Sequence, residues 1–141
     1  MLEVVNVACV RGDRTLFSDV SFTLARGALL HVAGANGSGK TSLLRIICCL
    51  LHPANGEVRW SGGNVHSLAG DYWTELAYIG HTNALKDDLT AAENLEIGAA
   101  LRGRTTTRET ALAALDRLGV SHCANLPVRV LSQGQRRRVT L

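Results

Sequence analysis

The sequence Gly34-Ala-Asn-Gly-Ser-Gly-Lys-Thr41 is the strongest indication of the fold of this chain. It matches the pattern G-x-x-x-x-G-K-[ST], and it lies between a compact apolar run, residues 28–33, and an expected helix from about Lys40 to Leu51. Glycines let a backbone wrap around a phosphate with several N–H groups pointing inward, and a helix N-terminus adds the positive end of its dipole. The stretch therefore predicts a nucleotide phosphate site, which we call the phosphate loop. A glycine-rich turn with an incidental lysine is the alternative, and the flanking strand and helix disfavour it.

Two side chains of the phosphate loop have specific expected roles. The Lys40 ammonium would reach the β- and γ-phosphates, and the Thr41 hydroxyl would be a ligand of Mg²⁺. The residues expected to contact the nucleotide are Gly34, Ala35, Asn36, Gly37, Ser38, Gly39, Lys40, Thr41 and Ser42.

The residues around the phosphate loop predict a mixed α/β region. Alternation over residues 2–24, around a Gly-Asp turn at Gly12, predicts an antiparallel meander. The apolar run 28–33 is typical of a buried parallel strand. Residues 57–60 and 76–79 predict two further short strands, with a loop between them.

The second half of the chain has a helical pattern. Thr90-x-x-Glu93 and Thr106-x-x-Glu109 both fit the capping box, in which a hydroxyl and a carboxylate bond the first-turn amides reciprocally. Ala111, Leu112, Leu115 and Leu118 form an apolar stripe that ends at Gly119, and core packing explains it. We therefore expect one domain with two lobes, residues 1–80 and residues 81–133.

Composition narrows the class of protein further. The chain has 141 residues, 46% of them hydrophobic and 19% charged, which argues against disorder. Its apolar stretches stop well short of the roughly 18 residues that a membrane span needs, and no basic segment precedes an apolar run as in a signal peptide, so we expect a soluble chain. A net charge of +3 does not by itself imply nucleic-acid binding. The four cysteines lack metal-ligand spacing and are expected to be buried, reduced thiols.

A second motif, Leu131-Ser-Gln-Gly-Gln135, lies later in the chain, with Ser132 92 positions after Lys40. Ser132 is expected to cap a helix, and Gly134 would let a phosphate oxygen approach the backbone at the start of that helix. The run Arg136–Arg138 comes next. Because it lacks interleaved aromatic residues for base stacking, we interpret it as a solvated or interface helix face rather than an RNA-binding segment.

The two motifs together resemble the ATP-binding subunits of ABC transporters. The resemblance implies an α/β fold, that of a P-loop NTPase, with an ABC-type nucleotide-binding domain made of an antiparallel β-subdomain and a helical subdomain. It divides residues 1–141 into a β-subdomain with the P-loop core (1–80), a helical subdomain (81–133) and the signature motif with the start of its helix (131–141). It also implies ATP and Mg²⁺ as cofactors, and a head-to-tail dimer with a second copy. In that dimer, the residues facing the partner's ATP would be Ser132, Gln133, Gly134 and Gln135.

Two positions depart from the pattern of that family. Arg11 stands where many members place an aromatic residue that stacks on adenine. A guanidinium can also stack on a ring, and a solvated arginine in a turn remains the alternative. His81 stands at the Q-loop position, where the family has a glutamine near Mg²⁺ and the attacking water, so the resemblance implies a catalytic role for His81 beside Lys40.

Shorter segments are similar to one branch of the family, the ATPase subunits of the cytochrome c maturation system. They are residues 9–14, 30–34, 56–60 and 80–90. This resemblance implies haem export driven by ATP, transmembrane subunits of that complex as partners, no nucleic acid, and a peripheral place on the cytoplasmic side of the bacterial inner membrane. The alternative is a soluble ABC-type ATPase without a membrane partner, such as a translation factor or an iron–sulfur assembly ATPase.

The family's water-activating residues have no counterpart in the sequence. No apolar run ending in Asp-Glu follows Ser132, although members of the family have such a strand after the signature. We therefore expect a domain truncated at its C-terminus, which keeps the phosphate-binding parts and is inactive as an ATPase alone.

Overall fold

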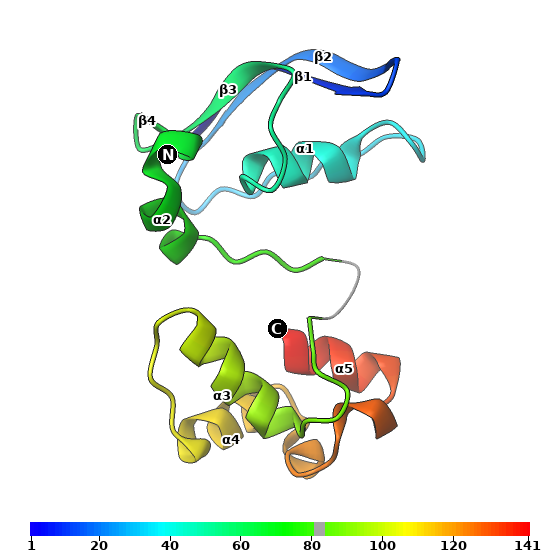
Figure 1. Ribbon diagram of the computed structural model, residues 1–141, viewed down its shortest axis with the longest axis vertical. Helices are drawn as coiled ribbons and strands as arrows, with labels where there is room; N and C mark the ends of the chain where they lie inside the picture. The colour runs from blue at the N-terminus through cyan, green and yellow to red at the C-terminus, as the bar shows by residue number, and fades with distance from the viewer. Residues whose placement is uncertain (81–83) are drawn as a thin grey trace. The chain divides into compact units, whose positions relative to one another are not determined.

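The computed structural model describes residues 1–80 and 84–141, which form two compact units, Met1–Ala77 and Tyr78–Leu141. The first unit holds all the named strands, and the second is helical (Figure 1). None of the helices in the described residues has the length and apolar character that a membrane crossing needs.

The sheet of the first unit is antiparallel throughout. Its strands are β1 (Leu2–Arg11), β2 (Arg14–Leu24), β3 (Asn55–Trp60) and β4 (Gly63–Asn64), in the order β2-β1-β3-β4. β1 and β2 pair from Leu2↔Leu24 to Arg11↔Arg14, which confirms the predicted meander and its turn. The strand predicted from residue 57 begins two residues earlier.

One face of β1 carries the core of this unit. A register shift between Val4 and Val7, with Asn6 at a φ of 49°, keeps both valines on the buried face. Helix α1 (Lys40–Ile47) packs against them through Leu43, Ile46 and Ile47. The buried members of this core are Leu2, Val4, Val7, Cys9, Leu43, Ile46, Ile47, Val58, Val65 and Tyr72.

Two predicted strands and one predicted loop were wrong. Residues 28–33 form no strand, and Leu29 is 94% exposed. Residues 76–79 are also irregular. A strand exists only where its backbone bonds to a neighbour, and no strand in the described residues pairs with either segment. The expected loop contains helix α2 (Val65–Glu75), capped by Asn64, whose side chain accepts the His66 N–H.

The second unit contains α3 (Ala91–Leu101), α4 (Arg108–Arg117), two short 3-10 turns, Ser121–Cys123 and Val128–Val130, and α5 (Gln133–Thr140). The capping box of α3 is the predicted pair of Thr90 and Glu93. α4 begins one residue later than predicted, because Thr107 and Thr110 form its box instead of Thr106 and Glu109.

The apolar stripe of α4 is confirmed in part. Ala111 and Leu115 are buried and Leu118 is half-buried, whereas Leu112 is exposed. The buried core of the second unit consists of Ala91, Ala92, Leu115, Val120, Cys123, Ala124, Val128, Leu131 and Val139.

A buried amide organises the approach to α3. The Asn94 side chain accepts the Lys86 N–H at 2.7 Å and donates to the carbonyls of Lys86 and Thr90, each at 3.0 Å. Because a buried amide is costly unless its bonds are made, this arrangement fixes residues 86–90 against the helix.

The four cysteines are free thiols, and one of them lies beside a stacked pair of histidines. Cys9, Cys48 and Cys123 are free and buried, as predicted, and Cys49 is half-buried. The Cys49 Sγ lies 3.0 Å from the His66 Nδ1, and the rings of His52 and His66 are stacked with centroids 4.1 Å apart. Burial, and then the charge of His52, lowers the pKa of His66, while burial raises the pKa of the Cys49 thiol. The pair is therefore neutral near pH 7.

The lowered pKa of His66 predicts how stability varies with pH. As pH falls, His66 takes up a proton at about pH 6.5 in the unfolded chain and only at a lower pH in the folded chain. The free energy of unfolding should therefore fall as pH drops below about 6.5, and level off below the pKa of His66 in the folded chain. In denaturant titrations from pH 7.5 to 5, His66→Gln should reduce this slope, and the exposed His31→Gln should keep it. Equal slopes in His66→Gln and the unsubstituted protein would contradict the assignment.

Candidate phosphate site

The phosphate loop turns directly into α1. Within it the Ser38 N–H donates to the Ala35 carbonyl at 3.2 Å, and Gly34, Gly37 and Gly39 have φ values of 151°, 81° and 95°. Gly39 is the N-cap of α1, without a side-chain bond to the first turn. Of the predicted strand, loop and helix, the structure contains the loop and the helix.

The Lys40 ammonium lies over the loop. Its Nζ donates to the carbonyl oxygens of Gly34 and Ala35, each at 2.8 Å. These bonds direct the charge of the ammonium group toward the loop backbone, where a phosphate oxygen would be a stronger acceptor than a neutral carbonyl.

The first turn of α1 begins with amides that come before its helical hydrogen bonds. The helical bonding begins with the Leu43 N–H, which donates to the Gly39 carbonyl at 2.8 Å, so the amides of Lys40, Thr41 and Ser42 precede that ladder. Such amides and the helix dipole suit an anion. The Thr41 side chain is exposed beside them, and a hard hydroxyl oxygen fits Mg²⁺ that also takes oxygens from phosphate and water.

Gly39 is packed closely against the hairpin. A Cβ built at Gly39 would lie 2.7 Å from the Phe17 Cδ1 and 3.2 Å from the Leu16 Cβ. The Leu16 and Phe17 side chains of β2 therefore leave little room for a side chain at Gly39. Leu16 and Phe17 were not predicted to belong to this site, because nothing in their spacing links them to a glycine more than twenty residues later.

We expect Gly39→Ala to disrupt the loop. The left-handed φ and the contact with Phe17 together should cost about 1–3 kcal/mol of stability. ATP affinity should fall with it, because the loop amides shift. Gly70→Ala is the matched control, since Gly70 is exposed inside α2 and a Cβ there meets nothing within 4 Å. Gly70→Ala should be neutral or stabilising, and a similar neutral result for Gly39→Ala in thermal unfolding would contradict this account.

Two further residues were predicted to belong to this site, Arg11 and His81. Arg11 is exposed at the end of β1, opposite Arg14 across the turn. His81 lies outside the described residues.

The second motif forms a capped turn, which we call the signature turn (residues 131–135). Ser132 is the N-cap of α5: its Oγ accepts the Gln135 N–H at 3.3 Å, and the Gln135 side chain accepts the Ser132 N–H at 2.8 Å. Gln133 and Gly134 are exposed in the first turn of the helix. The turn thus offers a hydroxyl and early helix amides to an anion.

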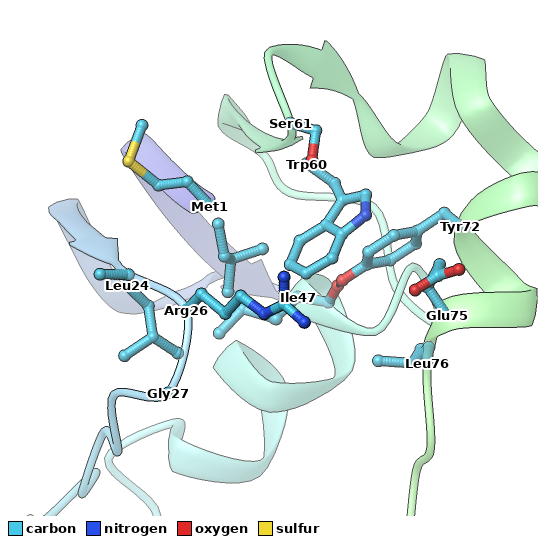
Figure 2. Close-up of a pocket in the computed structure, with 12 residues that line it drawn as sticks. Met1, Leu24, Arg26, Gly27, Ile47, Trp60, Ser61, Tyr72, Glu75 and Leu76 are labelled. Carbon is cyan, nitrogen blue, oxygen red and sulfur yellow. Dashed lines mark hydrogen bonds between the residues drawn. The ribbon is translucent and has the colours of Figure 1, made fainter.

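A separate pocket of about 640 Å³ lies in the first unit (Figure 2). Trp60 and Tyr72 are on its wall, with ring centroids 6.0 Å apart, and burial raises the pKa of Tyr72 to about 12 while its hydroxyl donates to the Ile47 carbonyl. No residue of the phosphate loop lines it. The pocket is therefore not the predicted phosphate site.

The comparisons with known proteins establish the family. The ABC transporter family profile matches residues 17–141. This chain belongs to the ABC transporter ATP-binding family. The fold is accordingly that of an ABC-type P-loop ATPase, as predicted.

Curated relatives make the similarity more specific. The chain is 54% identical over 140 residues to the cytochrome c biogenesis ATP-binding export protein CcmA of Nitrosospira multiformis, and 49% identical over 141 residues to that of Nitrosomonas europaea. These alignments cover 99% and 100% of the chain but 68% and 66% of the relatives, so the chain spans about two thirds of their length.

Solved structures agree in fold. An ABC transporter ATP-binding protein of Pyrococcus furiosus superposes with a TM-score of 0.85 at 25% identity, covering 98% of this chain and 66% of that one. A dimeric ATP-binding cassette bound to ADP and Pi superposes with a TM-score of 0.82 at 26% identity, covering 99% and 67%.

Proposed function

We propose that this chain provides the nucleotide-binding part of an ABC transporter ATPase subunit that drives haem export for cytochrome c biogenesis. The observation that carries the nucleotide site is the phosphate loop, with the Lys40 ammonium 2.8 Å from two loop carbonyls and α1 beginning directly behind it. The 45–54% identity to the CcmA relatives supports the export role.

The roles proposed for the residues follow from their chemistry. Loop amides from Gly34 to Ser42 and the Lys40 ammonium would bind the phosphates, and Thr41 would be a ligand of Mg²⁺. Arg11 would stack on adenine, and His81 would lie near the attacking water. In a head-to-tail dimer, Ser132, Gln133, Gly134 and Gln135 would face the nucleotide of the second copy.

The proposed partners are the transmembrane subunits of the cytochrome c biogenesis complex, with the chain bound peripherally at the cytoplasmic face of the inner membrane. A tagged chain, expressed from its gene with those subunits, should be isolated with them from detergent-solubilised membranes. Lys40→Ala should remain in the isolated complex, because that substitution changes the phosphate loop only. Recovery of the tagged chain entirely in the soluble fraction would overturn the membrane role and favour an ABC-type ATPase without a membrane partner.

A further inference from the structure

The Arg136 side chain folds back from α5 onto the residues that precede the signature turn. Its Nε donates to the Leu131 carbonyl at 3.2 Å, and its Nη2 donates to the Arg129 carbonyl at 3.0 Å. Its Nη1 donates to the Asp87 Oδ1 at 3.1 Å. One guanidinium therefore contacts the backbone on both sides of Val130 and a carboxylate from a segment before α3.

The segment that contains Asp87 is also joined by backbone hydrogen bonds to Val128 and Arg129, which precede the signature turn. The Val128 N–H donates to the Leu89 carbonyl at 2.9 Å, and the Arg129 N–H donates to the Asp87 carbonyl at 3.0 Å. The Arg129 Nη1 also lies 2.8 Å from the Asp88 Oδ1. Arg136 adds the bonds that join this pair of segments to α5 itself.

The bonds of Arg136 differ in how much they contribute to stability. The Asp87 side chain is 62% exposed, so its ion pair with Arg136 contributes little in water. Arg136 is only 23% exposed, and its bonds to the two carbonyls are charge-assisted. Their geometry needs a planar fork with several N–H groups, which a lysine lacks. The bonds from Arg136 to the two carbonyls should therefore stabilise the entry to the signature turn more than its ion pair with Asp87 does.

We infer that Arg136 is a positioning residue for the signature turn. By fixing the carbonyls of Arg129 and Leu131, it sets the direction in which the chain enters Ser132, and so the place of the Ser132 hydroxyl and of the first amides of α5. This inference rests on the proposed function, in which those groups face the nucleotide of a second copy. The Arg136 guanidinium is bonded to the carbonyls of Leu131 and Arg129, so its effect on the nucleotide would pass through the turn.

The neighbouring arginines provide the controls. The Arg138 side chain is exposed and makes no hydrogen bond to any described residue, so Arg138→Ala removes the same charge from the same helix. Arg136→Lys keeps the charge and loses the fork. Asp87→Ala removes only the exposed ion pair.

The first measurement is hydrogen–deuterium exchange in the whole chain. Arg136→Ala should speed exchange of the Leu131, Gln135 and Arg136 amides by about tenfold, equivalent to about 1.4 kcal/mol, because the entry to the turn is released. Asp87→Ala should speed it by less than about threefold, in keeping with the weak exposed ion pair. Arg138→Ala should leave it unchanged. Equal exchange in Arg136→Ala and Arg138→Ala would overturn the inference.

The second measurement separates positioning from general stability. Arg136→Ala should weaken association between copies in the presence of a non-hydrolysable ATP analogue by about tenfold, while binding of that analogue to the chain's own phosphate loop stays within about twofold. If unsubstituted copies associate and Arg136→Ala copies associate equally well, the inference is wrong.

Two further outcomes remain decisive. If unsubstituted copies fail to associate with the analogue bound, the proposed dimer fails, and the exchange data alone decide whether Arg136 holds the turn. If circular dichroism shows that Arg136→Ala does not fold, Arg136→Lys replaces it. Arg136→Lys should then show faster exchange and weaker association than Arg138→Ala, and parity between those two variants would overturn the inference.

Discussion

Lys40→Ala should lower the affinity of this chain for ATP by at least about thirtyfold, equivalent to about 2 kcal/mol. The ammonium is the one cationic group in the phosphate loop, and its Nζ lies 2.8 Å from the Gly34 and Ala35 carbonyls, where phosphate oxygens would arrive. Its loss removes charge-assisted bonds to the phosphates and leaves two loop carbonyls without their donor. No other single substitution in the loop removes a full charge.

The measurement is a titration with a fluorescent ATP analogue at fixed Mg²⁺ and salt. Lys86→Ala is the matched control, because Lys86 is the only other lysine and its side chain is exposed in the second unit. Lys86→Ala should bind the analogue like the unsubstituted chain. Binding by Lys40→Ala within about twofold of the unsubstituted chain, roughly 0.4 kcal/mol, would remove the phosphate loop from the site.

Local patterns predicted the elements whose bonds are local. The β1–β2 hairpin follows from alternation around a two-residue turn, and the caps at Thr90 and Ser132 bond amides three residues away. The cap of α4 moved by one residue because consecutive threonines can all supply the hydroxyl, and Thr110 fills the role expected of Glu109. Local chemistry alone does not decide between equivalent caps.

Elements that depend on distant partners were not predictable in the same way. The apolar composition of residues 28–33 is typical of a buried strand, but the backbone becomes a strand only beside another one. The contact between Arg136 and Asp87 spans 49 positions, and the basic run around Arg136 predicted only a solvated or interface helix face. In the phosphate loop, by contrast, the glycines, the lysine and the helix start all lie within eight residues, so the loop and the beginning of α1 could be predicted, although the packing of Gly39 on Phe17 could not.

A polypeptide of these 141 residues should not hydrolyse ATP faster than its Lys40→Ala variant. Phosphoryl transfer to water depends on positioning and on charge stabilisation, and ABC ATPases use a glutamate at the end of an apolar strand for the water. None of the twelve acidic residues follows such a strand after Ser132. Two of them are also poor bases: bonds from Asn64 and Arg59 lower the pKa of Glu57, and the Thr90 N–H and hydroxyl lower the pKa of Glu93.

The test is phosphate release by the purified polypeptide with saturating ATP and Mg²⁺, measured beside Lys40→Ala. Both should give the same background rate, although the unsubstituted polypeptide should still bind ATP through its loop amides and Lys40. Adding a full-length CcmA relative should restore hydrolysis at one composite site, because the relative brings its own phosphate loop and glutamate while this chain contributes Ser132 and Gly134. That rescue should vanish in Ser132→Ala but persist in Lys40→Ala, since the second substitution lies in the other nucleotide site. Release by the polypeptide alone above the Lys40→Ala rate would show that one of its twelve carboxylates activates the water.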